Sequence, residues 1–251
     1  MRIKFNKEIE FFIKKYFISE KFLLKKRLVR AYDKRYEEEL FVLDKIVPQD
    51  LESIDVGVYR GVYTYQLSKL SKHVHAFEPN PLIFEYLDVN LRNVIKNLTL
   101  YNVALSDQNS TAKLKIPNRN NISNKNNYEE LYKLGCATIH KENRIETNFT
   151  NFTVYTKKLD DILIGKKIGF IKIDVEGHEE NVLSGSINLI KKHKPNLLIE
   201  IEKRHSNKNV SDTIEYINKF GYKSYFFNGK DIIKTSSLTN LNFKNNFIFL
   251  S

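Results

Sequence analysis

Apolar strands alternate with amphipathic helices along most of the chain, starting near residue 51. Two short apolar runs, at 51–57 and 73–80, are each followed by a segment with helical periodicity. Near-continuous apolar runs recur at 169–177 and 195–202, as expected for parallel strands that are buried on both faces. Strands separated by helices in this way predict an α/β fold with a doubly wound sheet.

The remaining elements extend the same alternation. Residues 98–107 predict a third strand, and 179–193 predict one helix despite an internal glycine. Two aromatic runs, 223–227 and 245–251, are expected to pair as antiparallel strands. The polar stretch 117–148 is rich in asparagine and lysine and is longer than an ordinary connection. This stretch either overhangs a ligand site or reflects compositional drift.

The first 48 residues form a separate basic arm, and residues 49–251 form the domain proper. Residues 1–35 hold 12 basic and 4 acidic residues, in a chain of formal net charge +11. A first helix carries an apolar stripe made by Phe5, Ile9, Phe12, Ile13 and Tyr16. A second helix is expected to turn four side chains inward, namely Phe22, Leu24, Leu28 and Tyr32. The arm is expected either to cover the domain or to lie on an anionic membrane or glycan.

Composition indicates a cytoplasmic protein. No apolar run approaches the ~20 residues that span a bilayer, and the charged N-terminus lacks the apolar core of a secretory signal. The single cysteine, Cys136, cannot form an internal disulfide, which suits a reducing compartment. If the basic arm binds lipid, the protein is expected at the inner membrane face. The sequence predicts no oligomeric state.

The stretch "SIDVGVYRGVYTYQL" at 53–67 contains a strand that ends in an acid and a glycine turn. In open α/β sheets, ligands bind at the carboxyl ends of the strands. A dinucleotide-binding G-x-G-x-x-G turn requires glycine where Tyr59 and Val62 stand. Asp55 with Gly57 and Gly61 instead favours a ligand that bears an amine and no phosphate at this turn. The pattern therefore predicts S-adenosylmethionine as the cofactor, and not NAD.

A second acid, Glu78, ends the next strand, close to the ~20-residue offset of a ribose-binding carboxylate. A carboxylate at this place can accept hydrogen bonds from both ribose hydroxyls. The alternative is that Glu78 only caps the following helix. Two strand-end acids together with the glycine turn favour the binding role.

Five segments resemble the FkbM family of S-adenosylmethionine-dependent methyltransferases, in order and in spacing. They are "IDVGVYRGVYT", "AFEPNP", "NVALSD", "KKLDDIL" and "FIKIDVEGHEENVL". The resemblance covers roughly residues 51–250. It implies the Rossmann-like class I methyltransferase fold, which has a mostly parallel seven-stranded sheet with an antiparallel last strand. Members generally methylate hydroxyl oxygens, often on sugars or secondary metabolites.

The resemblance also assigns cofactor-binding residues. It maps the cofactor site to Asp55, Gly57, Gly61 and Glu78. It maps the segment that passes the adenine to Ala104 with its neighbours Asn102 and Asp107. One departure is that the family usually reads Gly-Ala-Asn where this chain has Gly57-Val58-Tyr59. Tyr59 is expected to stack on the cofactor or to hydrogen-bond in place of that asparagine.

The chemistry is expected in "IKIDVEGHEE", at the end of the fourth strand. Methyl transfer to an alcohol needs a base or a metal to remove the hydroxyl proton. Asp174, Glu176 and His178 are the candidate catalytic residues, with His178 as an alternative base. The structural alternative is that Glu176 and Glu179 only favour the N-terminus of the next helix. No metal is predicted, because no H-E-x-x-H or paired-cysteine spacing occurs, although three carboxylates could bind magnesium weakly.

These patterns predict an O-methyltransferase that acts on a sugar, a glycan or a related small metabolite. The competing hypothesis is a non-catalytic module that binds a membrane or a glycan through the basic arm. Nucleic acid is not an expected partner, because outside residues 1–35 the basic and acidic residues nearly balance. The sequence does not identify the methyl acceptor.

Overall fold

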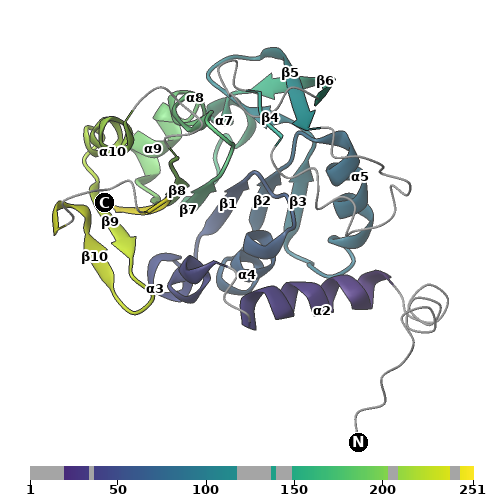
Figure 1. Cartoon of the computed structure of the whole chain (residues 1–251), viewed down its shortest axis with the longest axis horizontal. Helices are drawn as coiled ribbons and strands as arrows, with labels where there is room; N and C mark the ends of the chain where they lie inside the picture. Colours follow the sequence, from purple (N-terminus) through teal and green to yellow (C-terminus); the bar gives the residue numbers. More distant parts are fainter. Residues whose placement is uncertain (1–19, 34–36, 118–136, 140–148, 203–208, 238–243) are drawn as a thin grey trace, which may run out of the picture.

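A computed structural model describes most of the domain and part of the arm (Figure 1). The described residues are 20–33, 37–117, 137–139, 149–202, 209–237 and 244–251. The expected first helix at 5–16, Tyr32's side chain and most of the polar stretch 117–148 lie outside what is described. No helix in the described ranges is long and apolar enough to cross a membrane.

The central sheet has eight strands in the order β10-β9-β11-β8-β7-β1-β2-β3. The parallel strands are β1 (Glu52–Val56), β2 (Val74–Phe77), β3 (Leu98–Tyr101), β7 (Ile168–Ile173), β8 (Asn196–Glu200) and β9 (Lys223–Phe227). β11 (Asn246–Leu250) runs antiparallel between β8 and β9. The expected mostly parallel sheet and its antiparallel last strand are therefore confirmed, but the sheet has eight strands where seven were expected. β10 (Ile232–Lys234), which the sequence did not predict, adds an antiparallel strand at the edge.

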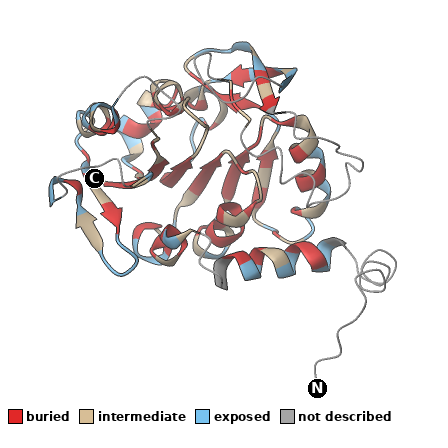
Figure 2. Ribbon diagram, viewed as in Figure 1, coloured by how far each residue is buried: buried red, intermediate tan, exposed pale blue. Residues whose placement is uncertain are grey.

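Helices cover both faces of this sheet, so the domain has three layers (Figure 1). One face carries α2 (Glu20–Asp33), η1 (Glu38–Phe41), α3 (Leu43–Ile46), α4 (Val62–Leu70) and α5 (Pro81–Asn90). The other carries α7 (Leu159–Ile162), α8 (Glu179–Ser184), α9 (Ile187–His193) and α10 (Val210–Asn218). A short 3₁₀ turn, η3 (Thr235–Ser237), follows β10. Figure 2 shows the buried strands between these layers.

The described part of the arm packs on the domain. Leu24 and Leu28 of α2 are fully buried, in the same apolar cluster as residues of α4 and α5. Phe22 was expected to point inward, but it is 58% exposed. It lies two positions before Leu24, which is about half a turn around a helix, and so faces the opposite side. Beyond α2, the segment 40–47 also contributes buried apolar residues to the domain core.

The expected helix at 179–193 is two helices, α8 and α9, separated at Gly185. A Cβ atom at Gly185 would lie 1.9 Å from the carbonyl oxygen of Ser106, so the backbones touch there. The interruption is therefore set by a tertiary contact that a local helical pattern does not reveal.

The expected third strand at 98–107 also divides. Its first part is β3, whereas β4 (Ala104–Leu105) joins a second sheet of order β4-β6-β5. The sequence did not predict the partners, β5 (Ser110–Pro117) and β6 (Phe149–Lys157), which pair antiparallel. Ala104 and Leu105 leave the central sheet because they pair with β6 instead. This second sheet lies beside the cavity described next.

Candidate active site

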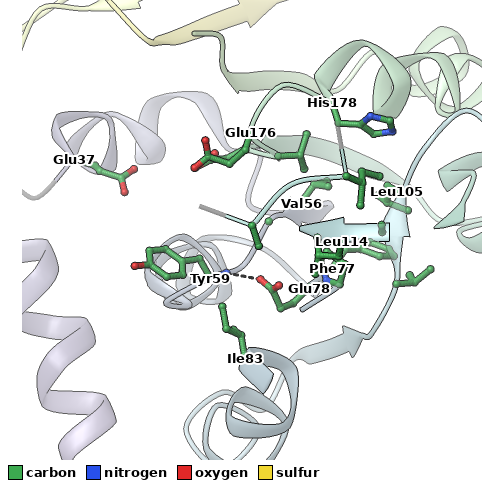
Figure 3. Close-up of a pocket in the computed structure, with 18 residues that line it drawn as sticks. Glu37, Val56, Tyr59, Phe77, Glu78, Ile83, Leu105, Leu114, Glu176 and His178 are labelled. Atoms are coloured by element: carbon green, nitrogen blue, oxygen red, sulfur yellow. Dashed lines mark hydrogen bonds between the residues drawn. The ribbon is translucent and has the colours of Figure 1, made fainter. Parts of the chain in front are cut away.

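A cavity of about 220 Å³ lies at the carboxyl ends of β1, β2 and β7 (Figure 3). Most of the residues singled out from the sequence line it, namely Gly57, Tyr59, Glu78, Ala104, Asp174, Glu176 and His178. The fold thus brings together residues from four separate segments of the chain. Apolar side chains, among them Phe77, Ile83 and Leu105, line other parts of the wall.

The glycine turn after β1 touches the end of β7. Gly57 has a φ of 88°, and a Cβ atom there would lie 1.9 Å from the carbonyl oxygen of Asp174. Gly57 also donates its N–H to the carbonyl of Phe77, at 3.0 Å. Only glycine fits both the left-handed conformation and this close approach. Gly57 therefore determines how near the turn lies to Asp174.

Glu78 is held in one orientation by the backbone. Its Oε2 atom accepts a hydrogen bond from the N–H of Tyr59 and its Oε1 atom accepts one from the N–H of Asn80, both at 2.9 Å. Asn102 donates its side-chain amide to the Glu78 carbonyl at 2.8 Å. Burial raises the pKa of Glu78 to about 7, and the charges of Asp55 and Asp174 act in the same direction. Each carboxylate oxygen retains a further lone pair to accept a bond from a ligand.

Tyr59 holds Glu78 through its backbone and not through its ring. Its φ of 46° is left-handed, a conformation that asparagine adopts more readily than tyrosine. The Arg60 guanidinium lies over the Tyr59 ring, 4.8 Å from its centroid. In Figure 3 the ring lies at the end of the cavity nearest Glu37. The role expected for the side chain, stacking on the cofactor, stays a prediction.

Four predicted cofactor residues do not line the cavity, namely Asp55, Gly61, Asn102 and Asp107. The carboxylate of Asp55 accepts a hydrogen bond from Thr64 on α4, and burial raises the pKa of Asp55 to about 7. Gly61, with a φ of 75°, begins α4. Asp107 accepts a hydrogen bond from Ser106 at 3.0 Å. These residues support the turns around the cavity.

The segment after Asp174 reverses direction sharply. Glu176 and Gly177 both have positive φ, of 54° and 101°. A left-handed glutamate is uncommon, and such strain is often found at functional sites. Thr138 donates its hydroxyl to the Glu176 carbonyl at 2.9 Å, and Gly177 donates its N–H to the Glu179 carboxylate at 3.0 Å. The turn is therefore fixed from two sides, and Glu179 has the helix-terminal role that the sequence offered as an alternative.

His178 points in a different direction from Glu176 (Figure 3). Its Nε2 atom lies 2.9 Å from the Ser106 hydroxyl, on the segment that follows β4. The imidazole is thus held at the side of the cavity formed by the second sheet. Asp174 and Glu176 also line the cavity and remain candidate catalytic residues.

The cavity has the opposite charge to the molecule as a whole. Among the described residues, four carboxylates line it, those of Glu37, Glu78, Asp174 and Glu176, and no lysine or arginine does. The whole chain carries a formal net charge of +11. The local field therefore favours a cationic or neutral ligand over an anionic one. Across the described ranges, no group of three or more His, Cys, Asp or Glu residues could hold a metal ion.

Several lining residues were missed in the sequence. Glu37 comes from the arm, and Leu114, Ala137 and Ile139 come from β5 and from the described part of the polar stretch. None of them belongs to a motif, and only the fold brings them to the strand ends. The position of Ala137 and Ile139 agrees with the expectation that the polar stretch passes a ligand site.

A family model described as the methyltransferase FkbM domain matches residues 55–224. No curated protein matches the chain. Among solved structures, a methyltransferase FkbM from Methylobacillus flagellatus KT has 18% sequence identity and a TM-score of 0.49. That comparison covers 80% of this chain but only 43% of the Methylobacillus chain. A SAM-dependent methyltransferase from Aquifex aeolicus has 14% identity and a TM-score of 0.43, and the comparison covers 92% of this chain and 97% of the other.

Proposed function

Because the chain belongs to the FkbM methyltransferase family, we propose that it transfers a methyl group from S-adenosylmethionine to a hydroxyl oxygen of a sugar, a glycan or a related metabolite. The observation that carries this proposal is one cavity at the strand ends that contains both Glu78 and Asp174. One carboxylate can bind the cofactor and the other can act on the acceptor. In the part of the lining that the structure describes, no lysine or arginine is present that would suit a phosphate.

The cavity fits S-adenosylmethionine in its chemistry. Glu78, fixed by two backbone N–H groups, would accept hydrogen bonds from the ribose hydroxyls. Ile83, Ala104 and Leu105 give the lining apolar surface that suits the adenine ring. The acidic lining suits the positive charge of the sulfonium and of the amine. Asp55 would not contact the cofactor directly; it accepts a hydrogen bond from Thr64 and so supports the turn.

Asp174 is the residue assigned to the acceptor hydroxyl. When bound, S-adenosylmethionine supplies an electrophilic methyl group, whose carbon–sulfur bond breaks with its electron pair left on sulfur. The acceptor oxygen gains this methyl group and loses its proton, which Asp174 accepts as a general base. Glu176 is positioned to hold other polar groups of the acceptor, and His178 is the alternative base.

Calorimetric titration provides the first test of this function. S-adenosylmethionine is expected to bind, and NAD is expected not to bind, because Tyr59 and Val62 replace glycines of a dinucleotide turn. Mass spectrometry of the host's glycans, with and without the chain, is then expected to reveal the loss of one methyl group. Binding of the cofactor without any change in methylation would favour the non-catalytic binding module.

We further infer that the arm contacts an anionic membrane at the cytoplasmic face, while its inner side packs on residues 49–251. The outward side of α2 combines exposed Phe22 and Val29 with Lys25, Lys26 and Arg30. A surface that joins apolar and basic side chains is suited to the boundary between lipid head groups and acyl chains. This contact is separate from the catalytic proposal and is tested separately below.

A further inference from the structure

Polar side chains continue below the cavity on one face of the central sheet. Strand register pairs Asp55 of β1 with Lys172 of β7, and Glu200 of β8 with Asn246 of β11. Ile173 pairs with Ile199, so the residues that follow them, Asp174 and Glu200, lie on neighbouring strands. Since alternate residues of a strand share a face, Lys172 and Asp174 point to the same side. These side chains therefore form a row across the strand ends, on the face covered by α4.

Lys172 is the cation of this row, and it is almost completely buried, with 1% of its surface exposed. Its Nζ atom lies 3.8 Å from the Oδ2 atom of Asp174 and donates to the Oδ1 atom of Asn246 at 3.3 Å. It also lies over the Tyr63 ring, 5.0 Å from the centroid. A buried ammonium is costly unless anionic partners compensate it. Although burial opposes it, Asp174 and the neighbouring carboxylates keep the pKa of Lys172 above its usual range.

The single positive charge of Lys172 does not neutralise all the carboxylates around it. Burial raises the pKa of Glu200, and the adjacent Asp174 raises it further through its charge and a hydrogen bond. The raised pKa favours the protonated form of Glu200, and a protonated carboxyl group donates to a neighbouring carboxylate. Lys172 and the Glu200 acid then contact the same group, Asp174, from two neighbouring strands.

We propose that Lys172 and Glu200 are positioning residues for methyl transfer, which hold the Asp174 carboxylate from the sheet side so that it meets the acceptor in one orientation. This inference rests on the proposed function of Asp174. The Lys172 ammonium supplies the opposite charge, and the neutral Glu200 acid supplies a hydrogen bond without adding a second negative charge. Neither residue lines the cavity, so both act through Asp174 and not on the acceptor.

Other titratable groups interact electrostatically with Lys172, Asp174 or Glu200 or with one another, and they affect the same pKa values. They are Asp55 on β1, Glu37 before η1, Glu39 in η1, Tyr63 on α4 and Glu202 after β8. Lys244, before β11, acts on Glu39. All of these groups are present in every variant below, so the variants differ in sequence only at Lys172, Asp174 or Glu200.

Infrared difference spectroscopy of the whole chain tests how Lys172, Asp174 and Glu200 interact, without any acceptor. At pH 7 the wild type is expected to show the carbonyl band of protonated carboxyl groups, with a component from Glu200. Glu200→Gln is expected to lack this component, whereas the components of Asp55 and Glu78, whose pKa values are about 7, remain in both proteins. Asp174→Asn removes the neighbouring negative charge, so Glu200 should then ionise at lower pH. Lys172→Met removes the positive charge, so ionisation should move to higher pH. Shifts of at least about one pH unit in opposite directions are expected.

A matched pair of variants tests the effect on catalysis, with the host's glycan fraction as acceptor. Glu200→Gln keeps a hydrogen-bond donor and should retain turnover within about tenfold, whereas Glu200→Leu should lose a further ~10-fold or more. Both should bind S-adenosylmethionine as the wild type does. Thermal unfolding shows which variants fold, and if Lys172→Met does not fold, the Glu200 and Asp174 variants decide the test.

Equal spectra for the wild type and Glu200→Gln at pH 7 would overturn the inference, as would an unshifted titration in Asp174→Asn. Equal turnover of Glu200→Leu and Glu200→Gln would show that a hydrogen bond from residue 200 does not position Asp174. These outcomes are separable from the proposed function, because the carbonyl band is read without cofactor or acceptor. If the band is present but the wild type neither binds S-adenosylmethionine nor methylates glycans, the proposed function fails instead.

Discussion

At the scale of single residues, Glu78 is proposed to bind the ribose of the cofactor. Its carboxylate already accepts two backbone hydrogen bonds, so it is fixed before any ligand arrives. Glu78→Ala removes the acceptor for the ribose hydroxyls, and charge-assisted hydrogen bonds contribute ~1.5–3 kcal/mol each. Calorimetry is expected to show at least a tenfold loss of affinity for S-adenosylmethionine.

The matched control for this variant is Glu85→Ala, which removes an exposed carboxylate from α5, the next helix along the chain. It is expected to bind S-adenosylmethionine as the wild type does. Equal affinities for Glu78→Ala and the wild type would remove Glu78 from the cofactor site.

Gly57 is the residue whose replacement should be least tolerated. A methyl group at Gly57 would overlap the Asp174 carbonyl at 1.9 Å, in addition to the cost of a positive φ. Gly165→Ala is the matched control, because Gly165 has a φ of 78° and nothing within 4 Å of its Cβ position. Urea unfolding is expected to show a loss of ~1–2 kcal/mol for Gly165→Ala and of more than ~4 kcal/mol for Gly57→Ala. Equal losses would mean that the turn does not press on Asp174.

The site residues that could be predicted from the sequence are those on motifs at strand ends. Glu78 and Asp174 follow apolar runs directly, so their place at the sheet edge follows from the strand pattern. Asp55 has the same signal, but its side chain alternates to the α4 face and meets Thr64. Glu37 carries no signal, because a carboxylate in a basic arm reads as a solvated charge until the fold brings it to the cavity.

At the scale of elements, α2 has two sides with different expected roles. Leu28 is fully buried and Phe22 is 58% exposed on the same helix. Leu28→Ala is expected to lower the free energy of unfolding by ~2–5 kcal/mol, whereas Phe22→Ala should change it by less than ~0.5 kcal/mol. Urea unfolding of both variants checks this contrast.

The same pair of variants separates packing from membrane contact. Phe22→Ala should weaken co-sedimentation with liposomes that contain acidic lipid, and added salt should weaken it further. Neutral liposomes are the control. If the full chain does not co-sediment with acidic liposomes at all, the arm has only its packing role.

The elements that the sequence did not reveal depend on distant partners. The periodicity at 179–193 is helical throughout, yet the contact between Gly185 and Ser106 divides the helix. Ala104 and Leu105 have the apolar character of a central strand, yet they pair with β6. Phe22 has the same apolar character as Leu24 but lies on the outer side of α2. Local patterns predict burial and periodicity, whereas these three outcomes depend on which distant segment each residue packs or pairs with.

At the scale of the whole molecule, buried acids predict how stability depends on pH. Burial raises the pKa of Asp55 to about 7, above the ~4 of an unfolded chain. Between these values the folded state keeps a proton that the unfolded state has lost, so the free energy of unfolding falls as pH rises. The stabilisation from Asp55 is complete below about pH 4 and is lost as pH passes through about 7.

Asp55→Asn is expected to remove this dependence, because an amide does not titrate and still accepts a hydrogen bond from Thr64. Relative to the wild type, the variant should gain stability as the pH rises from about 4 to about 7, with a slope of up to ~1.4 kcal/mol per pH unit, and no further above that range. Glu78 titrates in both proteins, but its contribution cancels only in part, because the charge of Asp55 raises the pKa of Glu78 in the wild type alone. Parallel stability curves from urea unfolding would show that Asp55 is not the buried acid proposed here.

The whole molecule combines a net positive charge with an acidic cavity, in which Asp174 is proposed to act on the acceptor and not on the cofactor. The most direct measurement compares Asp174→Asn with the wild type for both turnover and affinity for S-adenosylmethionine. Asparagine preserves the shape but cannot accept the proton, so turnover should fall by ~10²–10⁴. The affinity should change by less than about threefold, since Glu78 is intact. Full turnover by Asp174→Asn would contradict the catalytic role, and a large loss of affinity with unchanged turnover would place Asp174 in the cofactor site instead.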